Sequence, residues 1–442
     1  MKIAYFSPLN PLKTGISDYS EEILLKLKER VGQIDLFTDN YIPSNTEINS
    51  NFNIYQITSF EQMYSEYDEI IYHIGNNAKY HEQIYLTALK YPGIIVLHDF
   101  AIHHLIAQLT VGRNNWEDYI EEMKYNYGED GVEMAIESQN GHRQAIWETD
   151  MTLQYPINKR IIDKSKGVIV HSKFAKQQII ENIKPDCVVQ YAPLFAENIE
   201  KIGNQEMIQL RKRYGIDEQA LVFSSFGFIS RAKRIDVVID IIEELKNTYS
   251  NFIYLLVGEE EKDVYEMSKY IKSKNVDKYV KYIGYVNLEE FKDYVKLSDI
   301  CINLRYPTQG ETSASLLRII GYGKPVIVTD IGSFSELSND CCFKVNMASE
   351  KTDIKKYLKK FLDNPYLAKE IGQRASNYVQ ENYNVNQTLD AYVNILKWNF
   401  DFTELRYYEE LFNSVTEDLI SLGISSSDDM VDEISNLVGE II

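Results

Sequence analysis

Two predicted strands end in residues that could contact a ligand. His98 and Asp99 follow one apolar run, and His73 and Asn76 follow another. Ligands of open α/β sheets bind beyond the carboxyl ends of the strands, so these side chains are expected to face a crevice. A histidine there could hydrogen-bond a ligand hydroxyl or position an acceptor; the alternative is a capping or packing histidine. Three further histidines lack supporting context and are expected to be structural: His81, His142 and His171.

A basic cluster follows the strand predicted over Leu221–Gly227. Arg231, Lys233 and Arg234 place three cations within four residues, just before the next predicted helix. Cations at such a turn suit a diphosphate through charge-assisted hydrogen bonds. The alternative is a solvated basic turn, but a basic cluster at a predicted crevice of so acidic a chain favours binding.

The segment Leu304–Val328 predicts a strand, a polar loop, a helix, a Gly-x-Pro turn and another strand. The amides and positive potential of a helix N-terminus suit phosphate. Glu311 and Arg318 are seven residues apart, so they are expected to share a helix face, the acid for hydroxyls and the base for phosphate or ribose. The alternatives are a favourable first-turn acid and a surface salt bridge. Thr312 and Ser313 complete the loop, and Ser313 could also be a cap.

The loop after the first predicted strand contains Gly15, Asp18 and Tyr19. Gly15 would let the backbone approach a ligand, and amides at the following helix start could bind an anion. A simple turn is the equal alternative. The G-x-G-x-x-G pattern of dinucleotide sites is absent from the sequence.

These residues need a scaffold, and the pattern along the chain supplies one. Short apolar runs alternate with amphipathic helical segments, which predicts parallel sheets with crossover helices. The break between two such series is expected near Pro193–Lys201. The predicted strands are Lys2–Pro8, Ile34–Phe37, Glu69–His73, Gly93–His98, Gly167–His171 and Cys187–Tyr191, then Leu221–Gly227, Phe252–Gly258, Val280–Gly284, Ile300–Leu304 and Pro325–Thr329.

Three helices are predicted over residues 352–398, followed by an acidic tail. Residues 399–442 contain eleven acidic residues and one basic residue. One face of the last segment is apolar, which indicates either a helix docked on its own protein or a surface for self-association or a partner. The apolar residues are Met430, Ile434, Leu437, Val438 and Ile441.

Composition excludes several classes of protein. The 442 residues carry a net charge of −20, which argues against nucleic-acid binding and against electrostatic attachment to anionic lipid. The four cysteines lack C-x-x-C spacing, so neither a disulfide framework nor a zinc site is expected. No signal peptide and no membrane span are expected. We therefore expect a cytoplasmic protein, with peripheral contact at the inner face of the membrane left open.

Taken together, the motifs resemble the retaining glycosyltransferases of family 4, which have the GT-B fold. The resemblance spans residues 1–398 and depends on the order and spacing of its parts. It implies an α/β protein of two Rossmann-like domains facing a central crevice, with C-terminal helices. The parts are the Gly15 loop, His98-Asp99, Gly227 to Lys233, Gly258-Glu259, Tyr282 to Tyr285, Ser298-Asp299, the block from Glu311 to Val328, and Glu336.

The resemblance assigns domains and roles. Residues 1–198 would form the acceptor-side domain, with a helical insertion at about 109–165; residues 199–385 would bind the nucleotide sugar, and 386–442 would form C-terminal helices and the acidic tail. His98, Lys233 and Glu311 would act in catalysis. The donor-binding set would be Gly15, Gly227, Arg231, Lys233, Glu311, Thr312, Ser313, Arg318 and Glu336, and the acceptor side Asp18, Tyr19, His73, Asn76 and Asp99.

Two departures from the family pattern stand out. The arginine that usually precedes the lysine is Phe228 here. Counting back from Gly323-x-Pro325, the second glutamate of the usual pair falls on Arg318 and the first on Gly310, one residue before Glu311. A Gly-Glu-Thr-Ser…Leu-Arg variant of the motif fits these residues. We hypothesise that Arg318, with Arg231, supplies the charge missing at Phe228.

The resemblance implies a retaining transfer in which the departing diphosphate oxygen takes the acceptor's proton. No D-x-D metal anchor is present, so the sequence predicts a metal-independent enzyme without a cofactor, using a UDP- or GDP-sugar as co-substrate. The acceptor could be a glycan, a glycolipid or a protein. The alternatives are a sugar-nucleotide epimerase, a phosphorylase for which no lysine site is singled out, and a catalytically silent GT-B subunit that supports a partner enzyme.

Overall fold

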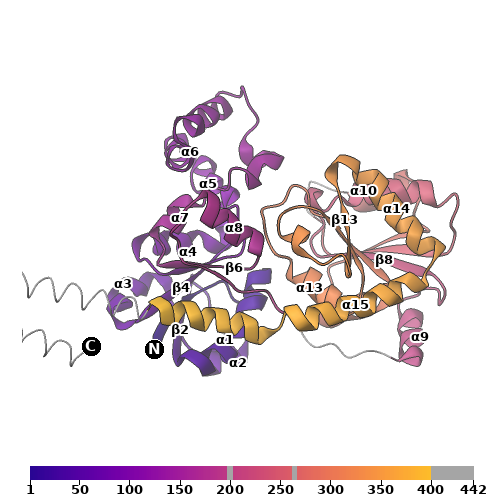
Figure 1. Ribbon diagram of the computed structural model, residues 1–442, viewed down its shortest axis with the longest axis horizontal. Coiled ribbons are helices and arrows are strands. Elements are labelled where there is room, and N and C mark those ends of the chain that lie inside the picture. Colours follow the sequence, from indigo (N-terminus) through magenta and orange to yellow (C-terminus); the bar gives the residue numbers. More distant parts are fainter. Residues whose placement is uncertain (197–202, 261–265, 400–442) are drawn as a thin grey trace, which may run out of the picture. The chain divides into compact units, whose positions relative to one another are not determined.

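The computed structural model describes residues 1–196, 203–260 and 266–399 (Figure 1). The first half forms a sheet of seven parallel strands in the order β3-β2-β1-β4-β5-β6-β7. Its strands are β1 (Lys2–Phe6), β2 (Gln33–Thr38), β3 (Asn53–Gln56), β4 (Glu69–Ile74), β5 (Ile94–Leu97), β6 (Gly167–Val170) and β7 (Val189–Tyr191).

The second half forms a sheet of six parallel strands in the order β10-β9-β8-β11-β12-β13. Its strands are β8 (Leu221–Phe226), β9 (Phe252–Val257), β10 (Val280–Gly284), β11 (Ile300–Asn303), β12 (Val326–Thr329) and β13 (Cys342–Val345). The predicted GT-B architecture of two Rossmann-like α/β halves is therefore confirmed.

All eleven predicted strands are present, and the structure adds β3 and β13. Both additions lie at a sheet edge. None of the four residues of β3 is fully buried, and only two of the four in β13 are. Short, half-exposed edge strands lack the continuous apolar run that marks a buried parallel strand, which is why the sequence pattern missed them.

Helices connect the strands of both sheets, as the alternation predicted. In Figure 1 the helices labelled α4 and α7 lie on one side of the first sheet, and α1 and α2 lie on the other. The first half contains α1 (Gly15–Val31), α2 (Thr46–Asn51), α3 (Phe60–Met63), α4 (Ala78–Lys90), α5 (His103–Leu109), α6 (Trp116–Gln139), α7 (Lys159–Lys164) and α8 (Lys173–Asn182). The second contains α9 (Asn204–Arg213), α10 (Ile235–Leu245), α11 (Met267–Ser273), α12 (Leu288–Leu297), α13 (Ala314–Gly321), α14 (Glu350–Asp363) and α15 (Tyr366–Asn382).

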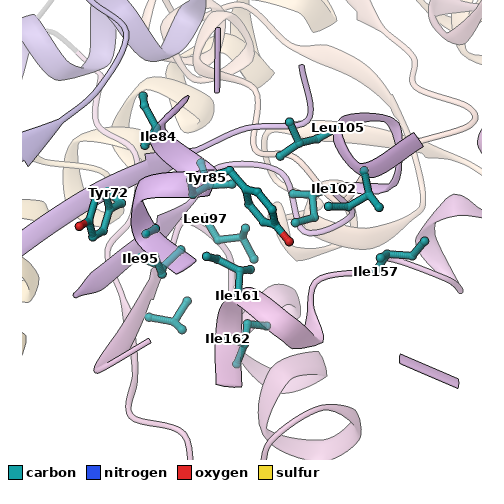
Figure 2. Close-up of a cluster of buried hydrophobic side chains, with 14 of the residues drawn as sticks. Tyr72, Ile84, Tyr85, Ile95, Leu97, Ile102, Leu105, Ile157, Ile161 and Ile162 are labelled. Carbon is teal, nitrogen blue, oxygen red and sulfur yellow. The ribbon is translucent and has the colours of Figure 1, made fainter. Parts of the chain in front are cut away.

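Each sheet has its own hydrophobic core. Figure 2 shows part of the first core, where Tyr85 of α4 packs among Leu97 of β5 and Ile161 of α7. The second core includes α10, whose apolar residues are all buried. Two separate cores let each sheet fold around its own buried face, which fixes the strand ends that carry the candidate site.

The strand order reverses once in each sheet, between β1 and β4 and between β8 and β11. Loops that follow the two strands at a reversal point diverge to opposite faces of the sheet and leave a crevice between them. The residues after β1, β4, β8 and β11 are therefore the ones that this fold offers to a ligand.

Three helical segments close the described chain, as predicted: α14, α15 and residues 385–399. Residues Met1–Tyr392 form one compact unit. The acidic tail and its apolar face, from Met430 to Ile441, lie outside the described residues. No helix among the described residues is long and apolar enough to cross a membrane.

Candidate functional site

Three glycines bring the ends of β8, β9 and β10 into contact. Gly227 follows β8 with a φ of +78°, and its N–H donates to Val257 O at 2.8 Å. The N–H of Gly258 donates to Gly284 O, also at 2.8 Å. A Cβ on Gly258 would lie 2.2 Å from Gly227 O, so only glycine allows this approach. The loop after β8 is thus held close against its neighbours.

The side chain of Lys233 lies next to Gly227. Only 8% of the residue is exposed, and its Nζ donates to Phe226 O. Burial is the main cause that holds the pKa of Lys233 well below its usual value, and the charge of nearby Arg305 is the second cause. A Cβ on Gly227 would come within 2.9 Å of the Lys233 Nζ, so Gly227 also leaves room for the ammonium group. Lys233 has no carboxylate partner among the described residues, and a buried cation in this position is suited to receive an anion.

The other two cations of the basic cluster do not join Lys233. Arg231 is exposed. Arg234 donates through Nε and Nη2 to both oxygens of Glu350, at 2.8 and 2.7 Å. That all three cations bind one diphosphate stays a prediction; in this structure both oxygens of Glu350, at the start of α14, hold the Arg234 guanidinium.

Glu311 lies in a loop and not on a helix. The helix α13 begins at Ala314, and Ser313 caps it by accepting from Leu316 N at 3.3 Å. The prediction that Glu311 shares a helix face with Arg318 was thus wrong, because the cap and the φ of +72° at Gly310 fold the preceding residues into a turn.

Both oxygens of Glu311 are engaged within this turn. Oε1 lies 2.9 Å from Arg305 Nε. Oε2 accepts from the Thr308 hydroxyl at 2.7 Å and from Gln309 N–H at 2.8 Å. Arg318, in contrast, forms an ion pair with Glu22 of α1. The turn therefore holds a carboxylate and an arginine side by side, directly after β11.

Three histidines gather where β4, β5 and β6 end. His73 Nδ1 and His98 Nε2 lie 2.8 Å apart, and the ring centroids of His98 and His171 are 4.7 Å apart. Tyr19 packs against His98 and His171 and shares a hydrogen bond with Tyr392 at 3.1 Å.

Burial disfavours the charged form of each histidine in this cluster. Burial lowers the pKa of His171 to about 4, and burial together with the neighbouring rings lowers the pKa of His73 and His98 well below the usual value. His73 and Tyr19, expected on the acceptor side, are both buried. His98 is the partly exposed member of the pair with His73 and can offer a neutral ring to a ligand.

Asp99 is held by the backbone of the neighbouring strand end. Its Oδ2 accepts from Asn76 N–H at 2.7 Å. Burial and the charge of Glu311 raise its pKa from the ordinary 3.8 to about 7. The side chain of Asn76 is itself engaged by His104 at 3.0 Å and Gln309 at 3.3 Å. The negative charge of Glu311, in the loop after β11, therefore acts on the carboxyl of Asp99, in the loop after β5.

Glu336 caps a helix in this structure. Its carboxylate accepts from Lys173 N–H at 3.0 Å and from Phe174 N–H at 2.5 Å, at the N-terminus of α8. Burial raises its pKa, and these two N–H groups partly offset the rise. Glu336 lines a pocket together with Thr312, Ser313 and His171. His171 Nε2 is buried and has no hydrogen-bond partner among the described residues.

The loop after β1 leaves the start of α1 open. Gly15 is the first residue of α1, and Thr14 caps the helix by accepting from Ser17 N at 3.0 Å. A Cβ on Gly15 would meet no protein atom within 4 Å, so packing within the protein does not require glycine there. Asp18 is exposed and accepts from the Asn10 side chain at 3.3 Å.

The structure therefore brings Glu311 near Asp99 and Arg305 near both Glu311 and Lys233, and it gathers Thr312, Ser313 and Glu336 in a pocket with His171. Arg231 is exposed, and Arg318 is paired with Glu22. Sequence reasoning did not single out Arg305 and expected His171 to be structural. Arg305 follows a predicted strand and His171 ends one, which is the signal that could have marked them. In the described part of the chain, no group of three or more His, Cys, Asp or Glu side chains is arranged to hold a metal ion.

Comparison with solved structures identifies the fold as that of GT-B glycosyltransferases. Sucrose-phosphate synthase from Thermosynechococcus elongatus superposes with a TM-score of 0.61 at 14% identity, covering 94% of this chain and 100% of the other. HepE from Anabaena, in complex with UDP and glucose, gives a TM-score of 0.63 at 15% identity, covering 90% and 99%.

Sequence comparison narrows the class for the second half of the chain. Residues 206–378, which contain the second sheet, match the family profile described as Glycosyl transferases group 1. An uncharacterized glycosyltransferase of Methanocaldococcus jannaschii is 28% identical over 247 residues, or 54% of this chain. The match spans 60% of the length of that relative.

Proposed function

We propose that this protein is a retaining, metal-independent glycosyltransferase that moves a sugar from a nucleotide-sugar donor to a glycan, glycolipid or protein acceptor. The observation that carries the proposal is the buried Lys233 at the reversal point of the second sheet, within the segment that matches the glycosyltransferase profile. A buried ammonium beside Gly227 suits the donor diphosphate.

The donor would lie across the ends of β8 and β11. Lys233 would bind the diphosphate, and Gly227 would let its oxygens approach the backbone. Thr312 and Ser313, next to the start of α13, would offer further donors to the phosphates. Arg318 and Glu336 are kept as donor-binding proposals that require their present partners, Glu22 and the start of α8, to release them.

The transfer would follow on one face of the donor sugar. The bond between the sugar and the diphosphate breaks, the acceptor oxygen bonds to the same carbon from the same face, and the departing diphosphate oxygen takes the acceptor's proton. Lys233 would stabilise the negative charge that develops on the diphosphate. The partly exposed, neutral His98 would orient the sugar, and the Gly15 and Asp18 region would hold the acceptor.

A UDP-sugar is the first donor to test, followed by a GDP-sugar. HepE is described in complex with UDP and glucose, and its fold covers 90% of this chain. The base and the sugar of the donor are specified by contacts that a fold comparison does not transfer, so both belong to the experiment.

A second function is favoured by the engagement of Glu311. Both of its oxygens already have partners within its own turn. A carboxylate so occupied fits a catalytically silent subunit that binds a nucleotide sugar and supports a partner enzyme. Such a subunit would bind donors and would neither hydrolyse nor transfer them.

The test is a screen of UDP-, GDP- and ADP-sugars for thermal stabilisation and slow hydrolysis, with EDTA present. A ligand at about 100 times its dissociation constant stabilises a fold by about 2.7 kcal/mol, which a melting curve resolves. Stabilisation with hydrolysis supports the transferase. Stabilisation without hydrolysis or transfer supports the silent subunit, and an absence of response to every donor contradicts both.

A further inference from the structure

Arg305 and the Lys233 loop leave neighbouring strands at the reversal point of the second sheet. β11 pairs with β8 at Ile300 and Phe223, and again at Cys301 and Ser224. Past the ends of both strands the two segments stay in contact, because Tyr306 N–H donates to Ala232 O. Phe228 is 53% exposed and brings no charge to this edge. The cation next to the Lys233 loop therefore comes from the adjacent strand.

Backbone hydrogen bonds fix Arg305 in this place. Its own N–H donates to the Thr329 hydroxyl at 2.9 Å, which ties it to the end of β12. The next residue, Tyr306, donates its N–H to Ala232 O at 2.7 Å, so the chain at 305–306 lies against the turn that carries Lys233. The Arg305 side chain is only 18% exposed. Two largely buried cations are thus positioned on adjoining loops.

Hydrogen-bonding capacity remains unused around this pair of cations. Arg305 Nε lies 2.9 Å from Glu311 Oε1, yet it is buried and not aligned for a hydrogen bond. Asn303, the last residue of β11, is 5% exposed, and its Nδ2 has no partner in the described part of the chain. Buried donors without partners are costly, and an anion bound between these strands would satisfy them.

We propose that Arg305 is the second cation of the donor diphosphate site and that the Glu311 carboxylate occupies the position of a diphosphate oxygen until the donor binds. The proposal rests on the proposed function, because it assumes a nucleoside diphosphate at Lys233. On binding, the guanidinium exchanges Glu311 for phosphate, with which it can form two parallel hydrogen bonds. The released Glu311 is then free to accept hydrogen bonds from donor-sugar hydroxyls.

Arg305 is better placed for this purpose than the other arginines near the site. Arg231 is exposed, and Arg234 is held by both oxygens of Glu350. Arg318 is paired with Glu22 of α1. The partner of Arg305 comes from its own turn, so the exchange requires only a local rearrangement of residues 305–311.

The test measures the binding of UDP, UMP and uridine by calorimetry in EDTA. If wild type prefers guanine or adenine, the diphosphate, monophosphate and nucleoside of that base are used instead. The variants are Arg305→Ala, Arg305→Lys and Arg318→Ala. Arg374→Ala is the control. Arg374 is an exposed residue of α15 paired with Glu370, and its substitution removes the same charge as Arg305→Ala. Melting temperatures verify that every variant is folded.

Arg305→Ala should weaken the nucleoside diphosphate about 10- to 100-fold, since a hydrogen bond to a charged group contributes more than a neutral one. Binding of the nucleoside should not change, and Arg305→Lys should be intermediate because lysine keeps the charge without the fork. Arg374→Ala should match wild type. Unchanged diphosphate affinity in Arg305→Ala overturns the inference, as does a loss confined to Arg318→Ala. If folded wild type binds none of the three nucleoside diphosphates, the proposed function itself fails and the inference fails with it.

Glu311→Gln tests the exchange separately. Removing the competing charge should raise the affinity for UDP and lower the affinity for the UDP-sugar relative to UDP. A loss of affinity for UDP itself would show that Glu311 assists the diphosphate site and does not compete for it, which contradicts the proposed exchange.

Discussion

At the scale of single residues, adjacent cations in this protein have opposite surroundings. Lys233 is buried and finds no carboxylate partner in the part of the chain that the structure describes, whereas Arg234, the next residue, is held by both oxygens of Glu350. An unpaired buried charge that waits for a ligand lowers the stability of the ligand-free protein. A charge that is paired with a carboxylate on another helix costs much more stability when its partner is removed.

Lys233→Met should therefore abolish most donor affinity without lowering stability. Burial depresses the pKa of Lys233 in the folded state below its unfolded value of about 10.5. When the pH falls below 10.5, the unfolded chain binds this proton more readily than the folded protein, so the lysine lowers the stability of the folded protein. Methionine fills a similar volume without the charge. Urea unfolding at pH 7 should show equal or higher stability, with UDP affinity reduced at least about tenfold. A clear loss of stability would mean that the lysine is structural.

Asp99→Asn should change how stability depends on pH. The pKa of Asp99 is raised to about 7 from 3.8, so the folded state holds a proton that the unfolded state has lost between these values. Wild type therefore loses stability from this group as the pH rises from about 4 to 7. Asparagine keeps the acceptor for Asn76 N–H and removes the titration. The variant should gain stability relative to wild type between pH 5 and pH 8, measured by chemical denaturation; a constant difference would contradict the raised pKa.

At the scale of elements, the Arg234–Glu350 pair joins the start of α10 to the start of α14. Glu350 is only 9% exposed, so its charge depends on this partner. Removing one member of a buried pair leaves the other uncompensated.

Arg234→Ala should lower the free energy of unfolding by about 1–3 kcal/mol, the cost of leaving a buried charged group without its hydrogen bonds. The double variant with Glu350→Gln should recover part of this loss, since no buried carboxylate remains. Donor affinity should stay at the wild-type value in folded Arg234→Ala. Equal stability of wild type and Arg234→Ala would show that water replaces the guanidinium.

The elements were predictable where a local pattern encodes them. The nine interior strands of the two sheets were all predicted, because their apolar runs are continuous. Of the four edge strands, β7 and β10 were predicted, whereas β3 and β13 were missed. The start of α13 was misplaced by the assumption that Glu311 belonged to the helix. Ser313, a good N-cap residue, marked the correct start.

At the scale of the whole molecule, charge is supplied to the candidate site by side chains. Lys233 and Arg305 bring cations from two loops, and the proposed donor would bring the compensating diphosphate. We expect donor hydrolysis or transfer to continue in EDTA with at least about half of the untreated rate, because side-chain cations can stabilise a leaving diphosphate. An absolute requirement for Mn²⁺ or Mg²⁺ in the same assay would contradict metal independence.

The candidate site was only partly predictable because its contacts connect distant parts of the chain. Lys233 and Glu311 follow strands and were found from local pattern. The pairing of Arg318 with Glu22, and the capping of α8 by Glu336, depend on the packing of segments more than 150 residues apart, which no local motif encodes. His171 and Arg305 follow strands too, but only the fold shows that they lie beside the other site residues.

Gly310 limits which descendants of this chain are accessible by single mutations. Its φ is +72°, and a Cβ there would lie 2.7 Å from Phe100 Cβ and 3.0 Å from Leu153 Cδ1. The usual family motif would place its first glutamate at this position. A Gly310→Glu reversion would meet both a strained backbone and a steric clash before it could restore any contact. A single substitution therefore does not reverse the one-residue shift of the glutamate. A return to the usual motif would require several substitutions within residues 308–313 at the same time.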